Sequence, residues 1–397
     1  MARITILCEG HLSSTVLKGG SQALKNFLVT LGALGHQSTV VSLWSKDETE
    51  QTLGACYPAD AFLRILCDPP PGLRCVDPHF TVAAVPEETK QVLHNLEPDV
   101  MLGFGWHALY VMGRWTSCPS LAYLGLPDYR LLAGRRRWSG EKRNNSPIAV
   151  AVSSADFTRR YLRARWRVAR LRGVVDLALA SDLDNLRRHA FVGRRGGRHY
   201  AAPIADTALP METRPLLTKK ILVINTEGSH SNASNSFLSE RIIPYFGALA
   251  GLAYELKFVG RDQEKFSLPL PLEIAQRTIV QGFTTPIESE FHSARCLLMC
   301  SPLPFGSSNR VKYAMMCGTV PVVHAAVTVG IPELIHGENC LIGTDGPEFV
   351  SYLERLLTDD SFRHRLAEGA RRTYEEEFLP ESRVPVLRAI LKQIGVH

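Results

Sequence analysis

The segment from Phe305 to Val323 constrains the fold of this chain more than any other part of its sequence. It begins with a glycine-containing loop, continues through the basic residues Arg310 and Lys312, and reaches a glycine turn at Gly318 before an apolar run. A loop that leads into a short helix and then into a buried strand is typical of α/β proteins. Because the free N–H groups at a helix amino terminus bind anions, this layout predicts an anion-binding site.

Length and composition predict a soluble enzyme of two domains. A chain of 397 residues exceeds one ordinary core, which holds about 150 residues. Apolar residues make up 45% of the chain and charged residues 21%, as in most globular proteins. No long apolar run occurs, and the first strand meets Glu9 too early for a signal peptide, so we expect a cytoplasmic protein. The nine cysteines lack paired spacing, which predicts neither disulfides nor a metal site.

The first part of the chain predicts a βαβ unit with ligand-binding glycines. A strand at Arg3–Cys8 is followed by Gly19 and Gly20 and by a helix from about Gln22 to Leu34. Glycines at a helix amino terminus allow a ligand to approach the backbone. A further strand ends in a glycine-flanked loop that presents Trp106 and His107. Since ligands bind beyond the carboxyl ends of parallel strands, His107 is a candidate substrate contact.

A second α/β unit is predicted to follow a linker at 207–218, where Pro210 and Pro215 interrupt any periodicity. Four consecutive apolar residues at 221–224 are typical of a buried parallel strand. A polar glycine loop at 227–235 precedes a helix expected from about 236 to 244. Further strands are expected near 254–259, 279–283 and 296–300, and their alternation with loops and helices predicts a second doubly wound sheet.

These motifs resemble GT-B glycosyltransferases, most closely glycosyltransferase family 4, the glycosyl transferases group 1. The resemblance is most specific over residues 296–342, where the loop before Arg310, the turn at Gly318 and Pro321, and the loop Gly330–Glu333 follow the family order. It implies an α/β GT-B fold with two Rossmann-like doubly wound parallel-sheet domains facing across a cleft. Residues 1–207 would form the acceptor-side domain and 208–379 the nucleotide-sugar domain, with a helix at 380–397 packing back on the first.

The resemblance also implies a function in carbohydrate biosynthesis. A hexosyltransferase-like enzyme would transfer a sugar from a nucleotide diphosphate sugar, its co-substrate, to an acceptor that the sequence does not identify. Retention of configuration is expected, without a metal or other cofactor, because protein cations replace the metal at the phosphates. His107 would be the catalytic residue, facing the donor sugar. The donor-binding residues would be Gly19, Gly20, Gly228, Gly306, Ser307, Ser308, Asn309, Arg310, Lys312 and Glu333.

The chain departs from the family pattern at the two glutamates that the family carries seven residues apart. Phe305 and Tyr313 stand in their places, and Glu227–Gly228 replaces a family Gly-Arg after the first strand of the second domain. One alternative is therefore a catalytically inactive GT-B homologue that acts as a binding or partner subunit. A nucleotide-sugar epimerase is another, although the carboxylates it needs are sparse here. A Rossmann dehydrogenase is disfavoured because no G-x-G-x-x-G follows the first strand.

Positive charge is concentrated in one region of the chain. Residues 131–200 contain 17 Lys and Arg against five acidic residues, a balance of +12, while the whole chain carries +6. One predicted helix at 159–172 holds seven arginines. One interpretation is a solvated helix face. The other is a dock for anionic lipid headgroups or a lipid-linked acceptor, which would place the protein peripherally at the inner face of the membrane. No nucleic-acid-binding module is recognisable, so no nucleic-acid partner is expected.

Overall fold

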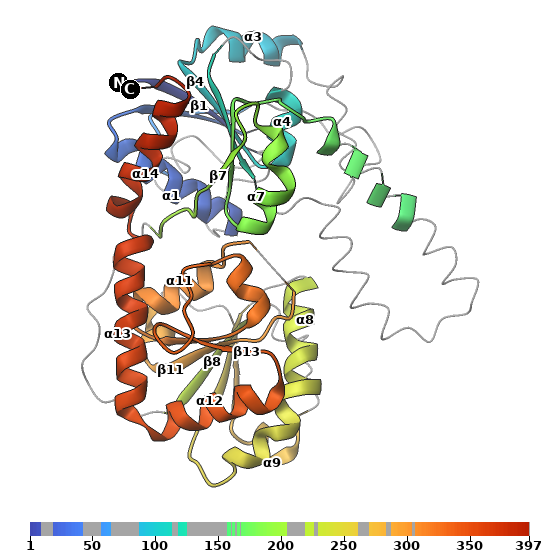
Figure 1. The fold of residues 1–397 in the computed structure, drawn as a ribbon, viewed down its shortest axis with the longest axis vertical. Helices are drawn as coiled ribbons and strands as arrows, with labels where there is room; N and C mark the ends of the chain where they lie inside the picture. The colour runs from blue at the N-terminus through green and yellow to red at the C-terminus, as the bar shows by residue number, and fades with distance from the viewer. Residues whose placement is uncertain are drawn as a thin grey trace. The chain divides into compact units, whose positions relative to one another are not determined.

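The computed structural model describes residues 1–8, 19–42, 57–64, 87–112, 118–124, 157–159, 161–162, 165–166, 168–204, 219–225, 229–260, 270–282, 287–303 and 306–396. The chain divides into two compact units. The first contains the strands up to Ala205 and the returning segment from Leu379 onward, and the described residues of the second lie within Asp206–Phe378. Each unit is built on one parallel sheet (Figure 1).

The first unit has, within its described residues, a seven-stranded parallel sheet. Its order is β3 (Ala61–Arg64), β2 (Gln37–Ser42), β1 (Arg3–Cys8), β4 (Val100–Phe104), β5 (Ser120–Leu124), β6 (Leu177–Ala180) and β7 (Gly197–His199). All residues of β1 after the first are buried. Alternate residues of a strand point to opposite faces, so both faces of this sheet are covered, which explains its continuous apolar runs.

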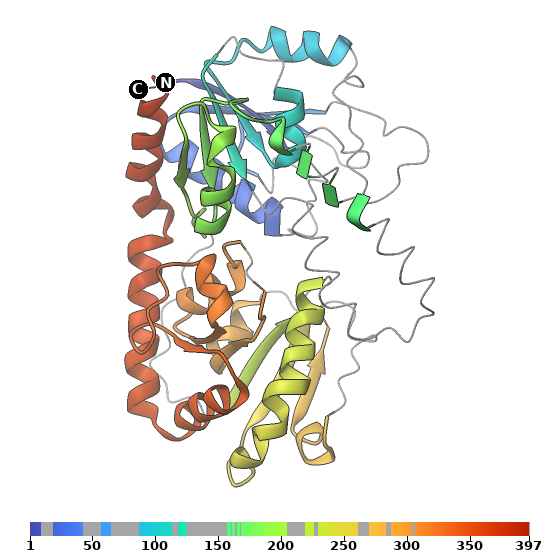
Figure 2. The same ribbon diagram turned by 45° about the vertical axis from the view of Figure 1, so that its right-hand side comes forward.

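Two separate groups of helices cover the first sheet. Helix α1 (Gly19–Ala33) and helix α14 (Pro380–Gln393) contribute Phe27 and Leu387 to the core on one face, and the two helices lie side by side (Figure 2). Helix α4 (Trp106–Met112) lies on the other face, where Val168 and Leu171 of the arginine-rich segment join it. The remaining helices of this unit in the described ranges are α3 (Glu87–Asn95), α7 (Leu183–His189) and the short η3 (Ala190–Val192).

The second unit has, in the part that the structure describes, a six-stranded parallel sheet. Its order is β10 (Thr278–Gln281), β9 (Glu255–Gly260), β8 (Lys220–Asn225), β11 (Ala294–Met299), β12 (Val320–His324) and β13 (Leu341–Gly343). The helical elements are α8 (Ser229–Phe237), η4 (Leu238–Ile242), η5 (Ile243–Leu249), α9 (Leu272–Ala275), α10 (Glu288–His292), α11 (Asn309–Met316), η7 (Ala325–Val329), α12 (Gly346–Thr358) and α13 (Asp360–Glu377). Side chains of η4, η5, α12 and α13 pack against the sheet and form a hydrophobic core with it.

Several boundaries differ from the sequence prediction. The polar segment after β8 was predicted to be a loop up to Asn235, but α8 begins at Ser229. Serine and asparagine have low helix propensity, and tertiary packing overrides it here, because Ala233 and Ser234 are buried. The sequence between Arg383 and Ile394 predicts a helix broken by proline, yet α14 continues through Pro385. Residues 150–154, whose sequence predicts a further strand, lie outside the described residues. Among the described helices, none has the length and apolar character to span a membrane.

Candidate functional site

The strand order of the second sheet reverses between β8 and β11. Strands β9 and β10 extend from β8 to one side, whereas β12 and β13 extend from β11 to the other. Ligands of open parallel sheets bind beyond the carboxyl ends of the strands at such a switch point. Arg310 lies at this position. Its Nη1 atom donates a hydrogen bond of 2.7 Å to the backbone oxygen of Ile224, near the carboxyl end of β8.

The surroundings of Arg310 favour an anion. Burial lowers the pKa of the Arg310 guanidinium to about 10, so the group keeps its positive charge at neutral pH. Ser308 is the N-cap residue of α11, but its side chain makes no capping hydrogen bond and its hydroxyl instead lies 3.4 Å from the sulfur of Met299. The Ser308 hydroxyl therefore does not occupy the first N–H groups of α11. A positive side chain beside a helix amino terminus is a suitable arrangement for binding phosphate.

Lys312 contacts a different part of the unit. It is 1% exposed, and its ammonium group lies 5.1 Å from the centroid of the Phe378 ring. Residues two apart in an α-helix are separated by about 200° around its axis, so Arg310 and Lys312 leave α11 in different directions. In the contacts that the structure describes, Arg310 bonds to Ile224 and Lys312 packs on Phe378. A role for Lys312 at the phosphates remains a prediction.

The predicted loop residues lie directly before and at the start of α11. Gly306 and Ser307 are half-buried, and Asn309 is the first residue of the helix. The Ser307 hydroxyl is buried and has no hydrogen-bond partner among the described residues, and the same is true of the Ser301 hydroxyl after β11. Buried hydroxyl groups normally have a partner. The connection between β11 and α11 therefore has hydrogen-bonding capacity that the described protein groups leave unused.

The loop that carries Glu333 is held by a residue that the sequence prediction missed. Asn339 is 3% exposed, and its Nδ2 donates hydrogen bonds of 2.9 Å to the backbone oxygen of Glu333 and to the Thr373 hydroxyl. Its Oδ1 accepts a hydrogen bond of 2.8 Å from the N–H of Ile335. The available sequence signal was the Gly-Glu-Asn turn at 337–339, in which Glu338 is exposed and Asn339 is buried. Asn339 fixes the backbone from which the half-buried Glu333 projects.

His324 is a second residue that the sequence prediction missed. It is the last residue of β12 and therefore lies at the same carboxyl edge as the end of β8. Its Nδ1 accepts a hydrogen bond of 3.0 Å from the N–H of Ala326, and its ring packs edge-on against Phe237 at 5.1 Å. Burial lowers the pKa of His324, so it is neutral at pH 7. A polar residue at the end of a buried apolar run was the available signal.

The candidate residues of the first unit lie at the starts of the helices that follow β1 and β4, the strands between which the order of that sheet reverses. Gly19 and Gly20 begin α1, and His107 is the second residue of α4. The prediction of a loop that presents Trp106 was wrong. Gly105, with a positive φ of 95°, allows α4 to begin at Trp106, which is 6% exposed and packs against His189. The side chain of His107 lies outside the described residues, as does Gly228.

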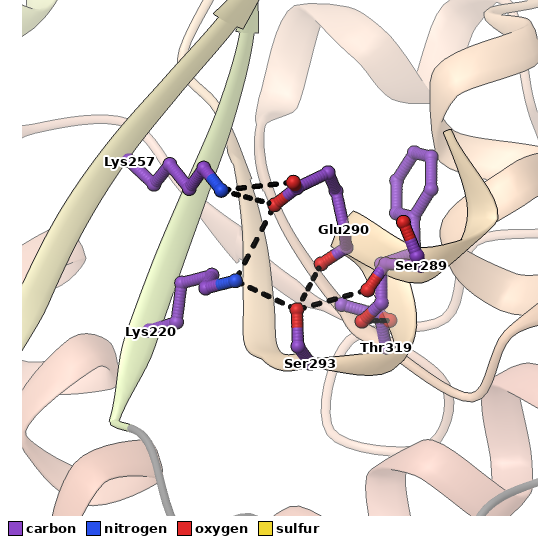
Figure 3. A network of polar contacts seen from close by, with 7 residues as sticks. Lys220, Lys257, Ser289, Glu290, Ser293 and Thr319 are labelled. Carbon is purple, nitrogen blue, oxygen red and sulfur yellow. Dashed lines mark hydrogen bonds and ion pairs between the residues drawn. The ribbon is translucent and has the colours of Figure 1, made fainter. Parts of the chain in front are cut away.

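A different charged group lies at the opposite end of β8. Lys220, the first residue of the strand, and Lys257 of β9 both contact the carboxylate of Glu290, at 3.3 and 2.8 Å (Figure 3). Lys220 also donates a hydrogen bond of 2.7 Å to Ser293. Burial alone would raise the pKa of Glu290, but hydrogen bonds and charge from the two lysines outweigh it and keep that pKa below its usual value.

The two cysteines that flank the apolar part of β11 are buried thiols of low reactivity. Cys296 and Cys300 are buried free thiols, and burial raises the pKa of Cys296 to about 12 and that of Cys300 to about 11. Both therefore stay protonated at neutral pH. Within the ranges that the structure describes, no group of three or more His, Cys, Asp or Glu residues lies close enough together to hold a metal ion.

Two parallel sheets, each with a reversal of strand order and helices on both faces, define a GT-B protein. Residues 236–359 match the family model of glycosyl transferases group 1. Anabaena HepE, crystallised with UDP, superposes with a TM-score of 0.68 at 14% identity, covering 98% of this chain and 100% of its own. Sucrose-phosphate synthase from Thermosynechococcus elongatus gives a TM-score of 0.66 at 14% identity and covers 98% of each chain. A glycosyltransferase from Rickettsia africae gives 0.66 at 11% identity, covering 99% of this chain and 98% of its own.

These likenesses confirm the fold predicted from the sequence. No curated protein matches the chain by sequence. The family match covers β9 to β13 and therefore includes α11 with Arg310, the segment on which the sequence resemblance rested. The chain has the GT-B fold, and its residues 236–359 are similar to group 1 glycosyl transferases.

Proposed function

We propose that this protein transfers a sugar from a nucleotide diphosphate sugar to an acceptor. The observation that carries the proposal is the position of Arg310. It lies within the segment that matches group 1 glycosyl transferases, and it bonds to the carboxyl end of β8 at the switch point of the sheet. HepE, which has the same fold, was crystallised with UDP and with UDP-glucose. A uridine diphosphate sugar is therefore the first donor to test.

Loss of a nucleoside diphosphate leaving group builds negative charge on its outer phosphate. In the proposed mechanism, Arg310 and the first N–H groups of α11 stabilise that charge, a contribution typically worth about 3 kcal/mol in a site that excludes water. Lys312 acts through the helix as a nearby buried charge rather than by contact. The loop from Gly306 to Asn309, with its Ser307 hydroxyl, supplies further hydrogen bonds. Because these groups are cationic or dipolar, the mechanism uses no metal.

The remaining candidates take supporting roles in the same proposal. Gly19, Gly20 and Gly228 would allow close approach of the donor to the backbone, and Glu333, on the loop held by Asn339, would contact the donor. His107, at the carboxyl end of β4, would act on the sugar and thereby affect turnover. Retention of configuration and a hexosyl donor follow the family resemblance and belong to the proposal on that ground.

One observation favours a second candidate, an inactive binding subunit. Tyr313 stands where the family carries a glutamate, and its ring stacks on Phe291 at 6.2 Å with an angle of 12° between the planes. The position thus contributes to packing and supplies no carboxylate to a donor. A protein of this kind would bind a nucleotide sugar without consuming it.

A panel of nucleotide sugars separates these candidates. The purified protein is tested for thermal stabilisation by each donor and by UDP, and the mixtures are analysed for released nucleotide, transferred sugar and epimerised donor. Stabilisation with release or transfer supports the glycosyltransferase. Stabilisation with the donor intact supports the binding subunit, and an epimerised donor supports an epimerase. If no nucleotide or nucleotide sugar stabilises the protein, the donor site is wrong.

A further inference from the structure

The segment from Phe157 to Arg172 is the most basic stretch of the chain, with seven arginines and no acidic residue. Where the structure describes it, residues up to 169 are helical and 170–172 form a turn. Val168 and Leu171 are 7% and 4% exposed and belong to the core of the first unit. These two side chains attach the segment to one face of the sheet, so its other side is not needed for the core.

The exposed side of this segment carries large apolar side chains. Leu162 is 56% exposed and Trp166 is 60% exposed. The guanidinium of Arg170 lies 4.7 Å from the centroid of the Trp166 ring. Each residue of an α-helix is rotated by about 100° around the helix axis from the one before. Four exposed residues therefore lie within roughly 80° of one another around this axis, on the side opposite Val168 and Leu171. We call them the arginine–tryptophan stripe: Arg159, Leu162, Trp166 and Arg170.

We propose that the arginine–tryptophan stripe binds the surface of a bilayer with anionic headgroups, inserting Trp166 and Leu162 at the headgroup boundary. The inference goes beyond the proposed glycosyl transfer and does not depend on it. Arginine binds phosphate groups through several N–H donors while its carbon stem lies along apolar surface. Tryptophan is amphipathic and favours the boundary between headgroups and acyl chains. The segment therefore matches such a surface in charge and in apolar character together.

The apolar residues favour a lipid over a nucleic acid. Proteins bind single-stranded nucleic acids through a basic groove in which several aromatic rings stack on successive bases. An exposed leucine gains little from that partner, whereas a bilayer removes it from water. Phe157 and Tyr161, the other aromatic residues of the segment, stack on each other at 5.9 Å. Leu162 beside a single exposed tryptophan, whose ring already contacts Arg170, is thus better suited to insertion than to base stacking.

Vesicle sedimentation tests the proposal with the full chain. We expect the protein to sediment with vesicles of phosphatidylglycerol and phosphatidylcholine and to stay in solution with phosphatidylcholine alone. Trp166→Ala should weaken binding about tenfold and Leu162→Ala about fivefold, because each removes one inserted side chain. Arg159→Gln with Arg170→Gln should weaken binding about tenfold at low salt, with a smaller effect at high salt.

Matched controls lie elsewhere on the surface. Leu272, which is 73% exposed in the second unit, and Arg388, exposed on α14, should tolerate Leu272→Ala and Arg388→Gln without any change in binding. All replaced side chains are exposed, so melting temperatures should stay within about a degree of the wild type. Lipids brominated near the headgroup should quench the fluorescence of the wild type but not of Trp166→Phe, which reports insertion directly.

Three outcomes would overturn the proposal. Equal sedimentation with neutral and anionic vesicles, or none with either, would exclude an anionic lipid surface as the partner. Binding that salt abolishes and that Trp166→Ala leaves unchanged would show adsorption of charge without insertion. Trp166-dependent binding of a single-stranded oligonucleotide, in the absence of vesicle binding, would identify a nucleic acid as the partner.

Discussion

Buried cations lie at both ends of strand β8 and have different partners there. At the amino end, Lys220 and its neighbour Lys257 share the carboxylate of Glu290. At the carboxyl end, Arg310 donates to the neutral backbone oxygen of Ile224, and burial lowers its pKa. The two lysines at the amino end thus share one carboxylate counterion within the protein, which stabilises the fold. Arg310 lies at the carboxyl end, which is where a site in a parallel sheet belongs.

The largest expected effect is on stability at the amino end. Glu290→Gln leaves two buried ammonium groups without their countercharge, and we expect the free energy of unfolding to fall by about 3 kcal/mol at pH 7. The pKa of Glu290 is lowered from 4.5 in the folded protein. Its contribution is therefore complete above that pH and is lost as the pH falls through the folded-state pKa. Urea unfolding of both proteins should show a difference that shrinks below pH 4.5.

UDP affinity, measured on the same variant, tests whether the amino end of β8 affects the proposed site at the carboxyl end. It should be unchanged in Glu290→Gln as long as the protein is folded. A difference in unfolding free energy that stays constant down to pH 3 would contradict the ionic role of Glu290.

A second test extends the comparison to the first sheet. His107→Ala, at the carboxyl end of β4, should lower turnover about 100-fold, or about 2.7 kcal/mol, while donor affinity and melting temperature stay unchanged. The matched control is His36, directly before β2 at the amino end of the sheet, whose Nδ1 accepts a hydrogen bond from the N–H of Ala2. Steady-state kinetics should show normal turnover for His36→Ala. Normal turnover in both variants would leave His107 without a catalytic role.

A third test compares two buried arginines of the second unit. Arg310→Ala should lower UDP affinity about 30-fold, or about 2 kcal/mol, because a charge-assisted contact to phosphate is lost. Arg295 lies near the amino end of β11 and donates to the backbone oxygen of Leu356 at 3.2 Å. Arg295→Ala should destabilise the protein and leave UDP affinity unchanged. Titration calorimetry measures both, and equal affinity losses would show that the amino end also influences the site.

The smallest expected effect concerns Lys312. Lys312→Met keeps the length of the buried side chain and removes its charge, and we expect UDP affinity to fall about threefold, or about 0.65 kcal/mol. The loss is small because the ammonium group packs on Phe378 and acts at a distance. Calorimetry on Lys312→Met and Arg310→Ala under the same conditions decides the point. Equal losses would mean that both cations contact the phosphates.

The sequence predicted the strands of both sheets, but it did not predict which side chains contact one another around them. Runs such as Ile221–Ile224 predicted buried strands because both faces of a parallel sheet are covered. The same reasoning could not find α8, whose Ser and Asn residues disfavour a helix until Ser234 packs near Cys300. Sequence proximity suggested that Arg310 and Lys312 act as a pair. Their different partners follow from helix rotation together with the positions of Ile224 and Phe378, which only the fold supplies.

The arginine-rich segment shows the same limit on the surface. Its composition predicted a charged helix, and the alternation of Arg with apolar residues did not reveal which apolar residues face the core. Val168 and Leu171 do so, whereas Trp166 does not. That distinction depends on how the segment lies against the sheet, a tertiary contact that periodicity alone does not specify.

The return of α14 to the first unit determines the order in which the chain can fold during synthesis. Leu387 and Ile390 complete the core beside α1, yet the ribosome makes them after the whole second unit. At about 5–20 residues per second, the growing chain holds the α1 face uncovered for roughly 10 to 40 seconds. The described residues of the second unit all lie between Asp206 and Phe378, so this part can fold during that time. The first unit to emerge is therefore the last to be completed. Until α14 is made, chaperones would bind the uncovered apolar face beside α1.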